Sequence, residues 1–365
     1  MPAIDAPVVT RLREAGAISL GKTTTSEFGW KGISQSPLTG ITHNPRRLGY
    51  NAGASSAGAG AGAAAGYGSS HVGSDGAGSI RMPSHFCGVF GLKPTHGRVP
   101  HWPVPNSDQT SNVEPMTRTV ADAALMLKAM AGPHPWDHTT LEAPPKNYLN
   151  LLERDLTGLR VAFSLDLGHA RVDSEVTELV ERAARSFEDL SCTVEEPEVP
   201  FGPDGPELIR FLWPAHEQWL GARLADWGDK MDPGLVACIR AGAGLAMDDY
   251  LQMRARKLTY IEQVHRFFED WDLLLTPAAS VAAFPADRLQ PEDWPGHDWD
   301  WVMWGESSYS FNFSGNPAAS VPCGFTGAGL PVGLQVAGRR FDDLGVLQAA
   351  AFERAHPWAG TRPPL

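Results

Sequence analysis

The chain has 365 residues, of which 42% are hydrophobic and 20% charged, and its formal net charge is −12. This length is enough for a large buried core in one or two domains. The negative charge disfavours nucleic acid and anionic membrane surfaces as partners, and no stretch approaches the ~20 apolar residues of a membrane span. The first residues lack the features of a signal peptide. We therefore expect a cytoplasmic protein that acts on a small molecule, with no nucleic-acid or membrane partner.

The first third of the chain predicts a helix that begins near Asp5 and ends at Gly16, then a short buried strand over 17–20. Residues 50–70 are almost entirely Gly, Ala and Ser. Their Ala-rich part, 59–65, predicts a small-residue helix packed tightly in a core, not a flexible linker. A strand near residue 72, a second Gly-rich turn over 74–79 and a helix over 119–131 should follow.

The remaining two thirds predict an alternation of strands and helices. Strands are expected over 159–163, 192–194, 273–275, 318–321 and 332–336, and helices over 173–190, 206–226 and 247–271. The Trp-rich segment 294–304 either lines an aromatic pocket or forms a packed loop. This order favours an α/β fold with a largely buried sheet.

Two motif matches do not predict what they superficially suggest. Residues 16–23 satisfy the G-x-x-x-x-G-K-[ST] pattern of a phosphate-binding loop, but the expected strand lies inside the motif and no clear helix follows it. His134 and His138 have the spacing of a helical metal pair, but Pro135 lies between them. A metal site could also form in three dimensions from His85, Cys87, His96 and His101, but their spacing in the sequence does not require one. We expect neither a metal nor another cofactor.

The four cysteines lie far apart without CxxC pairing, so we expect reduced thiols. Cys87 is either a nucleophile or a small buried residue beside a turn, and the second interpretation is preferred. No G-x-S-x-G nucleophile elbow is present, which argues against an α/β-hydrolase.

The turn Gly76-Ala77-Gly78-Ser79 has the residue types that an oxyanion hole needs. Its small side chains allow several backbone N–H groups to point to one place, and Asp75 could brace the turn by accepting N–H bonds. A serine here could attack an amide carbonyl if a base removed its proton.

The sequence also resembles the amidase signature family. GASSAGAGAGAAAG and GSDGAGSIRMPSHFCGVFGLKPTHGRVP are similar to its two signature segments, and further matches run from DAPVVTRLREAGAISLGKTTTSEF to FNFSGNPAASVPCGFTGAGLPVGLQVAGRRFDD. The resemblance implies a single α/β domain over residues 1–365, with a central mixed sheet flanked by helices and a signature core at about 50–100. A homodimer is compatible with this expectation.

The family carries a Ser–cis-Ser–Lys triad, and the motif match gives roles to individual residues. Ser79 corresponds to the nucleophile and Ser55 to the bridging serine, which implies a cis peptide bond before Ser55. The N–H groups of Gly76, Ala77, Gly78 and Ser79 would form the oxyanion hole, and Asp75 and Arg81 would brace the site. The implied reaction is hydrolysis of a carboxamide through an acyl-enzyme.

The chain departs from the family pattern at its lysine. The family's catalytic Lys ends an apolar strand well before the segment that matches residues 15–23, and no lysine of this chain has that context. We therefore expect that the chain lacks the family's N-terminal elements, including the general base and a core strand. Alternatively, Lys22 or Lys31 replaces that base. Ala54, Ala57 and Ala77 also stand where glycines are usual.

The sequence thus predicts an amidase-type serine hydrolase that acts on a small-molecule amide. One alternative is a glutaminase-type subunit of a tRNA-dependent amidotransferase, which Met82 disfavours because Gln is expected there in that branch. The other is a catalytically inactive homologue that acts as a binding or scaffold protein.

Overall fold

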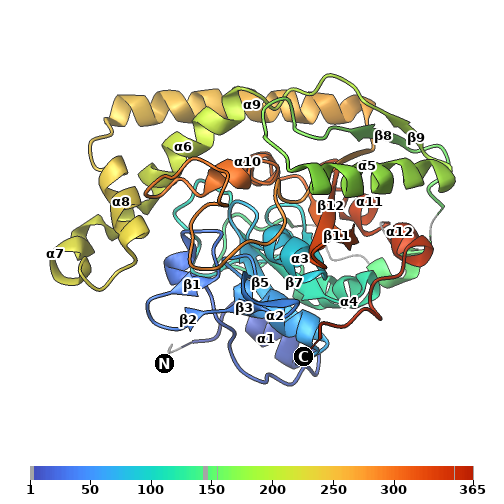
Figure 1. Ribbon diagram of the computed structural model, residues 1–365, viewed down its shortest axis with the longest axis horizontal. Helices are drawn as coiled ribbons and strands as arrows, with labels where there is room; N and C mark the ends of the chain where they lie inside the picture. Colours follow the sequence, from blue (N-terminus) through green and yellow to red (C-terminus); the bar gives the residue numbers. More distant parts are fainter. Residues whose placement is uncertain (1–3, 143–146, 154, 349, 365) are drawn as a thin grey trace.

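The computed structural model describes residues 4–142, 147–153, 155–348 and 350–364. An eight-stranded mixed sheet crosses the molecule in the order β5-β7-β6-β11-β12-β10-β8-β9 (Figure 1). Its strands are β5 Ser70–Asp75, β6 Phe90–Lys93, β7 Asn112–Thr117, β8 Arg160–Phe163, β9 Thr193–Glu195, β10 Leu273–Pro277, β11 Ala318–Phe325 and β12 Pro331–Gly338. The β10–β8 and β8–β9 pairs are parallel and the other pairs antiparallel.

Two ribbons and a set of helices complete the described fold. The ribbons pair β1 Gln35–Ser36 with β2 Gly40–Ile41, and β3 His43–Asn44 with β4 Arg47–Asn51. The α-helices are α1 Pro7–Glu14, α2 Ala57–Ala65, α3 Arg81–Cys87, α4 Val120–Met130, α5 Ser174–Asp189, α6 Asp204–Glu217, α7 Leu224–Trp227, α8 Pro233–Gly242, α9 Met247–Asp270, α10 Tyr309–Phe313, α11 Asp343–Leu347 and α12 Ala350–Ala355. The 3-10 helices are η1 Glu27–Gly29, η2 Tyr148–Leu151, η3 Gln218–Arg223 and η4 Val302–Trp304.

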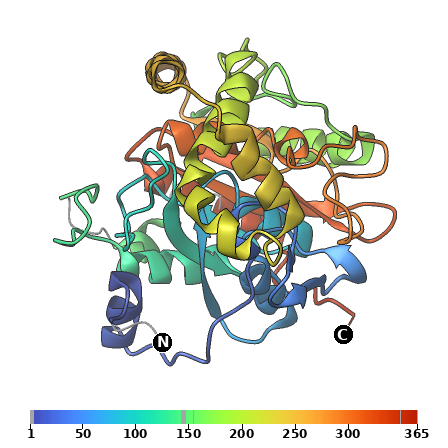
Figure 2. The same ribbon diagram turned by 90° about the vertical axis from the view of Figure 1, so that its left-hand side faces the viewer.

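The sheet separates two hydrophobic cores because successive side chains of a strand point to opposite faces. In β10, Leu273 and Leu275 join one core, whereas Leu274 joins the other. The first core takes the apolar faces of α4 and α5, and the second takes those of α6, α8 and α9. Figure 2 looks at the side formed by α7 and α8, with α9 seen nearly along its axis. The predicted α/β class with a mixed central sheet flanked by helices is confirmed.

Helix α2 shows why the Ala- and Gly-rich segment is helical and not a linker. Ala59 and Ala63 are fully buried, and a Cβ on Gly58 would lie 2.4 Å from the backbone nitrogen of Thr24. Small residues therefore let the helix approach its neighbours more closely than larger side chains would permit.

The predicted buried strand over 17–20 is wrong. These residues have no regular structure, and the side chains of Ile18 and Leu20 are 87% and 81% exposed. An apolar run becomes a strand only when another strand pairs with it, and in the described part of the chain none pairs with this segment. The helix predicted over 206–226 is also interrupted, because α6 ends at Glu217 and η3 follows.

The Trp-rich segment forms a packed loop over the second core. Trp301 and Trp304 are 1% and 0% exposed and belong to that core. All four cysteines are free, as expected. Over the residues that the structure describes, no helix has the length and apolar character needed to cross a bilayer.

Candidate active site

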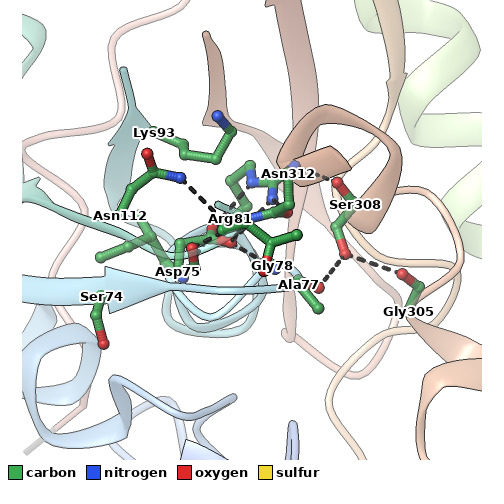
Figure 3. Close-up of polar contacts among 12 residues, drawn as sticks. Ser74, Asp75, Ala77, Gly78, Arg81, Lys93, Asn112, Gly305, Ser308 and Asn312 are labelled. Carbon is green, nitrogen blue, oxygen red and sulfur yellow. Dashed lines mark hydrogen bonds and ion pairs between the residues drawn. The ribbon is translucent and has the colours of Figure 1, made fainter. Parts of the chain in front are cut away.

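The turn that links β5 to α3 is organised around the carboxylate of Asp75 (Figure 3). Its oxygens accept the N–H groups of Gly78 at 2.6 Å and Ile80 at 3.1 Å. The guanidinium of Arg81 donates to the same carboxylate through Nε and Nη2, each at 3.0 Å. A bidentate pair of this kind fixes position as well as charge, so Asp75 determines the path of the turn.

Every N–H donor of Arg81 has an acceptor. Besides Asp75, its guanidinium donates to the backbone carbonyl of Ser308, to Gln335 Oε1 and to Asn312 Oδ1. Asn312 in turn donates to Asp75. Arg81 and Asp75 are both fully buried. The pair is therefore a satisfied charge network that joins the turn to α10 and β12.

The pKa of Asp75 reflects two opposed influences. Burial alone would raise this pKa, but the charge and hydrogen bonds of Arg81, followed by the Asn312 amide, lower it to about 2. The carboxylate therefore stays ionised at neutral pH and continues to accept the N–H groups of the turn.

Gly78 is required at its position for two reasons. Its φ is +114°, a conformation that residues with a side chain rarely adopt, and a Cβ there would lie 2.3 Å from Ser308 Oγ. The Ser308 hydroxyl itself donates to the carbonyl of Ala77 at 2.6 Å and to that of Gly305. These contacts hold the Ala77 carbonyl on the Ser308 side of the turn.

The orientation of the N–H groups corrects one part of the sequence prediction. The family resemblance implies that Gly78 contributes to an oxyanion hole, but its N–H donates to Asp75 and is not free for an oxyanion. None of the hydrogen bonds made by the described residues uses the N–H of Gly76, Ala77 or Ser79. These three N–H groups are therefore without a hydrogen-bond acceptor among the described residues.

The two candidate serines lie on adjoining turns. The backbone N–H of Ser56 donates to the carbonyl of Ser79 at 3.3 Å, and the peptide bond between Ala54 and Ser55 is cis. Ser55 and Ser79 are 6% and 4% exposed. Within the described residues, neither hydroxyl has a hydrogen-bond partner, and no bond joins one to the other.

The lysines proposed as alternatives to the family's base do not reach these serines. Lys22 is exposed and makes no polar contact with a described residue. Lys31 is buried, but its ammonium pairs with the carboxylate of Asp232 at 2.5 Å. Among the lysines that the structure describes, none hydrogen-bonds to Ser55 or Ser79.

A second pair of ionisable groups lies beside Asp75 on the sheet. Burial, followed by the charge of Arg81, lowers the pKa of Lys93 to about 8. Burial and the charge of Asp75 raise the pKa of Glu114 well above its usual range. Both carboxyl oxygens of Glu114 are without a partner among the described residues, so its neutral form is favoured.

Other nucleophile and metal candidates are not supported by their surroundings. Burial raises the pKa of Cys87 to about 12, so its thiol stays protonated and unreactive. His85 contacts the backbone at Gly333 and Val281. Across the described ranges, no group of three or more His, Cys, Asp and Glu residues is arranged to hold a metal ion.

A cavity of about 230 Å³ adjoins the turn. Its lining includes His96, His101, Ser107 and Ser111. Ser111 Oγ lies 4.0 Å from the position that a Cβ would take on Gly76. Gly76 therefore lies beside a residue that lines this cavity. A larger cavity of about 520 Å³ is lined by Lys31 and Asp232 and by neither serine.

Several residues of the site were not found from the sequence. Ser308, Asn312 and Gln335 lie more than 200 residues after the turn. The match of residues 311–343 to the family pattern pointed to the segment of Asn312 and Gln335 but not to Ser308. His96 was considered from the sequence only as a possible metal ligand, and Ser111 was not considered.

Comparison with known proteins agrees with this fold. The profile of the Amidase family matches residues 1–347. An acylamidase of Rhodococcus erythropolis is 39% identical over 370 residues, which cover 98% of this chain and 76% of that protein. A glutamyl-tRNA(Gln) amidotransferase subunit of Moorella thermoacetica is 33% identical, over 100% of this chain and 79% of that protein. The crystal structure of a bacterial aryl acylamidase of the amidase signature family matches with a TM-score of 0.89 at 28% identity, covering 98% of this chain and 76% of that one.

The mixed sheet and its flanking helices are thus those of an amidase signature enzyme, a class that hydrolyses amides. The chain belongs to the amidase family.

Proposed function

We propose that the protein hydrolyses carboxamides by acyl transfer to Ser79. The observation that carries this proposal is the turn itself: Ser79 directly follows a braced loop that presents the free N–H groups of Gly76, Ala77 and Ser79. Donors that are already oriented toward a developing negative charge stabilise a tetrahedral intermediate without reorganisation during the reaction.

In the proposed reaction, Ser79 Oγ forms a bond to the amide carbonyl carbon while its proton passes toward Ser55. The carbonyl oxygen becomes the oxyanion at the turn. The C–N bond then breaks as the nitrogen takes up the proton that left Ser79, and the nitrogen leaves as ammonia or an amine. Water attacks the resulting ester, releases the carboxylic acid and returns a proton to Ser79.

The relatives favour acyl amides as the substrate class. The names of the Rhodococcus protein and of the aryl acylamidase both describe cleavage of acylated amines. Met82 stands where the glutaminase-type branch is expected to have Gln, and in this structure it is fully buried beside the turn. We therefore propose an acylamidase and not an amidotransferase subunit.

Hydrolysis of 4-nitroacetanilide, followed by absorbance, and of hexanamide, followed by ammonia release, tests the proposal. We expect Ser79→Ala to lower kcat/KM at least about 1000-fold, because the nucleophile is lost. Ser69→Ala, an exposed serine outside the site, is the matched control and should retain full activity. Retention of more than a tenth of the activity in Ser79→Ala would contradict the assignment.

Proton removal from Ser79 needs a separate test, because no described lysine contacts Ser55. That observation favours one second candidate, a binding protein without turnover. Wild-type protein that binds hexanamide but releases no ammonia would support this candidate. If turnover occurs, Lys22→Ala and Lys31→Ala should leave it unchanged, and a loss of more than tenfold in either would assign proton removal to that lysine.

A further inference from the structure

The cavity beside Gly76 contains buried polar atoms that the fold does not use. His96 Nε2, His101 Nδ1 and Ser107 Oγ are all buried, and none has a hydrogen-bond partner among residues 4–142, 147–153, 155–348 and 350–364. Buried polar atoms without partners are uncommon in folded proteins because each costs free energy. Three of them around one cavity indicate a place where a ligand supplies the missing partners.

The hydrogen bonds of His96 identify which partner it lacks. Asn112 Nδ2 donates to the carbonyl of Thr110 at 3.2 Å, so Asn112 Oδ1 is the acceptor that faces His96 Nδ1 at 3.1 Å. His96 Nδ1 therefore carries the hydrogen. Burial, followed by the charge of Lys93, lowers the pKa of His96 to about 4, so the ring is neutral and Nε2 presents a bare lone pair.

His101 has the same arrangement. Its ring donates to the backbone carbonyl of Ser111, and burial lowers its pKa, so the neutral ring presents Nδ1 as an acceptor. Asp108 also lines the cavity, but its carboxylate is already paired with Arg254 and Lys257. The two imidazole acceptors and the adaptable hydroxyl of Ser107 therefore require hydrogen-bond donors from the ligand.

The loop that carries these groups is held in an unusual conformation. Asp108 and Gln109 have φ values of +53° and +64°, which are uncommon outside glycine and tend to occur at functional segments. Helix α9 anchors the loop, because Lys257 Nζ donates to the carbonyl of Asp108 at 2.9 Å and Arg254 pairs with its carboxylate. The strained loop is thus fixed in place next to the turn that links β5 to α3.

We infer that this cavity binds a neutral, N–H-bearing end of the substrate, such as a primary carboxamide distal to the bond that is cleaved. The inference rests on the proposed function and deepens it by naming a substrate class, a small diamide. A volume of about 230 Å³ holds a short chain with one terminal amide. A cationic end is disfavoured because Asp108, the acidic residue of the lining, already pairs with Arg254 and Lys257 and offers no free counter-charge.

The ligand-side test uses two probes of equal size on Ser79→Ala protein, in which binding does not depend on turnover. Succinamide has an NH2 group at each end, and 4-oxopentanamide replaces one NH2 with CH3. Beyond the twofold statistical factor, we expect succinamide to bind about tenfold more tightly in titration calorimetry, because the methyl ketone leaves the imidazole acceptors unpartnered. Equal affinities would overturn the inference.

The protein-side test applies the same two probes to His96→Phe and His101→Phe in the Ser79→Ala background. We expect the tenfold preference to fall to about the statistical factor in either variant, while His356→Phe, an exposed histidine outside the cavity, keeps it. A preference that survives in both cavity variants, with folding verified by circular dichroism, would also overturn the inference. Because binding is measured, a failure here is distinct from absence of hydrolysis, which concerns the proposed function alone.

Discussion

Two neighbouring regions of this molecule treat buried polar groups in opposite ways. In the turn around Asp75 and Arg81, every charged atom has a partner, and the network joins β5, α3, α10 and β12. Among the residues that line the adjoining cavity, His96, His101 and Ser107 have buried polar atoms without a hydrogen-bond partner in the described part of the chain. The first arrangement fixes a geometry, and the second is suited to binding something that arrives from outside.

The difference has measurable consequences for stability. Breaking a satisfied buried network leaves an uncompensated charge or donor, whereas removing an atom that already lacks a partner deletes nothing that the fold uses. Substitutions in the turn should therefore be costly, whereas removal of the unpartnered Ser107 hydroxyl should leave stability unchanged.

The largest effect is expected for Arg81→Leu, which leaves the carboxylate of Asp75 buried without its guanidinium. We expect the free energy of unfolding in urea to fall by about 3–5 kcal/mol. Arg266→Met removes an exposed ion pair with Glu262 and should cost no more than about 0.5 kcal/mol. A loss below about 1 kcal/mol in Arg81→Leu would show that the network is not what fixes the turn.

The second largest loss in the free energy of unfolding is expected for Gly78→Ala. The new Cβ would clash with Ser308 Oγ and would hold alanine at a φ of +114°, so we expect a loss of about 2–3 kcal/mol. Gly158→Ala isolates the backbone contribution, since Gly158 has a φ of +80° and open space around it. If the two variants lose equal stability in urea unfolding, the contact with Ser308 contributes nothing.

Acid should weaken the turn through protonation of Asp75. Because the folded-state pKa of Asp75 is lowered from 3.8 to about 2, the unfolded chain binds this proton more readily between those values. The stabilisation is therefore present above pH 4 and is lost as the pH falls toward 2, by about 2 kcal/mol. Urea unfolding of wild type and of Asp75→Asn over pH 5 to 2 measures it. A decline of equal size in both proteins would contradict the assignment.

The smallest effect is expected for Ser107→Ala, which removes a hydroxyl without a partner. Its free energy of unfolding should stay within about 0.5 kcal/mol of the wild-type value. Ser308→Ala is the matched serine of the turn, and loss of its hydrogen bonds should cost about 1–2 kcal/mol. A larger loss in Ser107→Ala than in Ser308→Ala would reverse the comparison.

Sequence reasoning succeeded where the signal was local. The apolar spacing of Val176, Leu179 and Phe187 predicted α5, and the Gly–Ser composition of 74–79 predicted a turn. It failed where the outcome depends on distant partners. The strand expected over 17–20 needed a neighbour, and the orientation of the Gly78 N–H depends on a carboxylate that Asn312 and Arg81 hold in place. Spacing alone also could not show that His96 and Ser107 share a cavity.

Covalent labelling of Ser79 tests the central claim most directly. A fluorophosphonate forms a P–O bond to an activated serine Oγ and releases fluoride. The account predicts a single adduct on the peptide that contains Ser79, absent from Ser79→Ala and retained in Ser107→Ala, when the digested proteins are examined by mass spectrometry. A protein that stays unlabelled, or an adduct on another residue such as Cys87, would contradict the account.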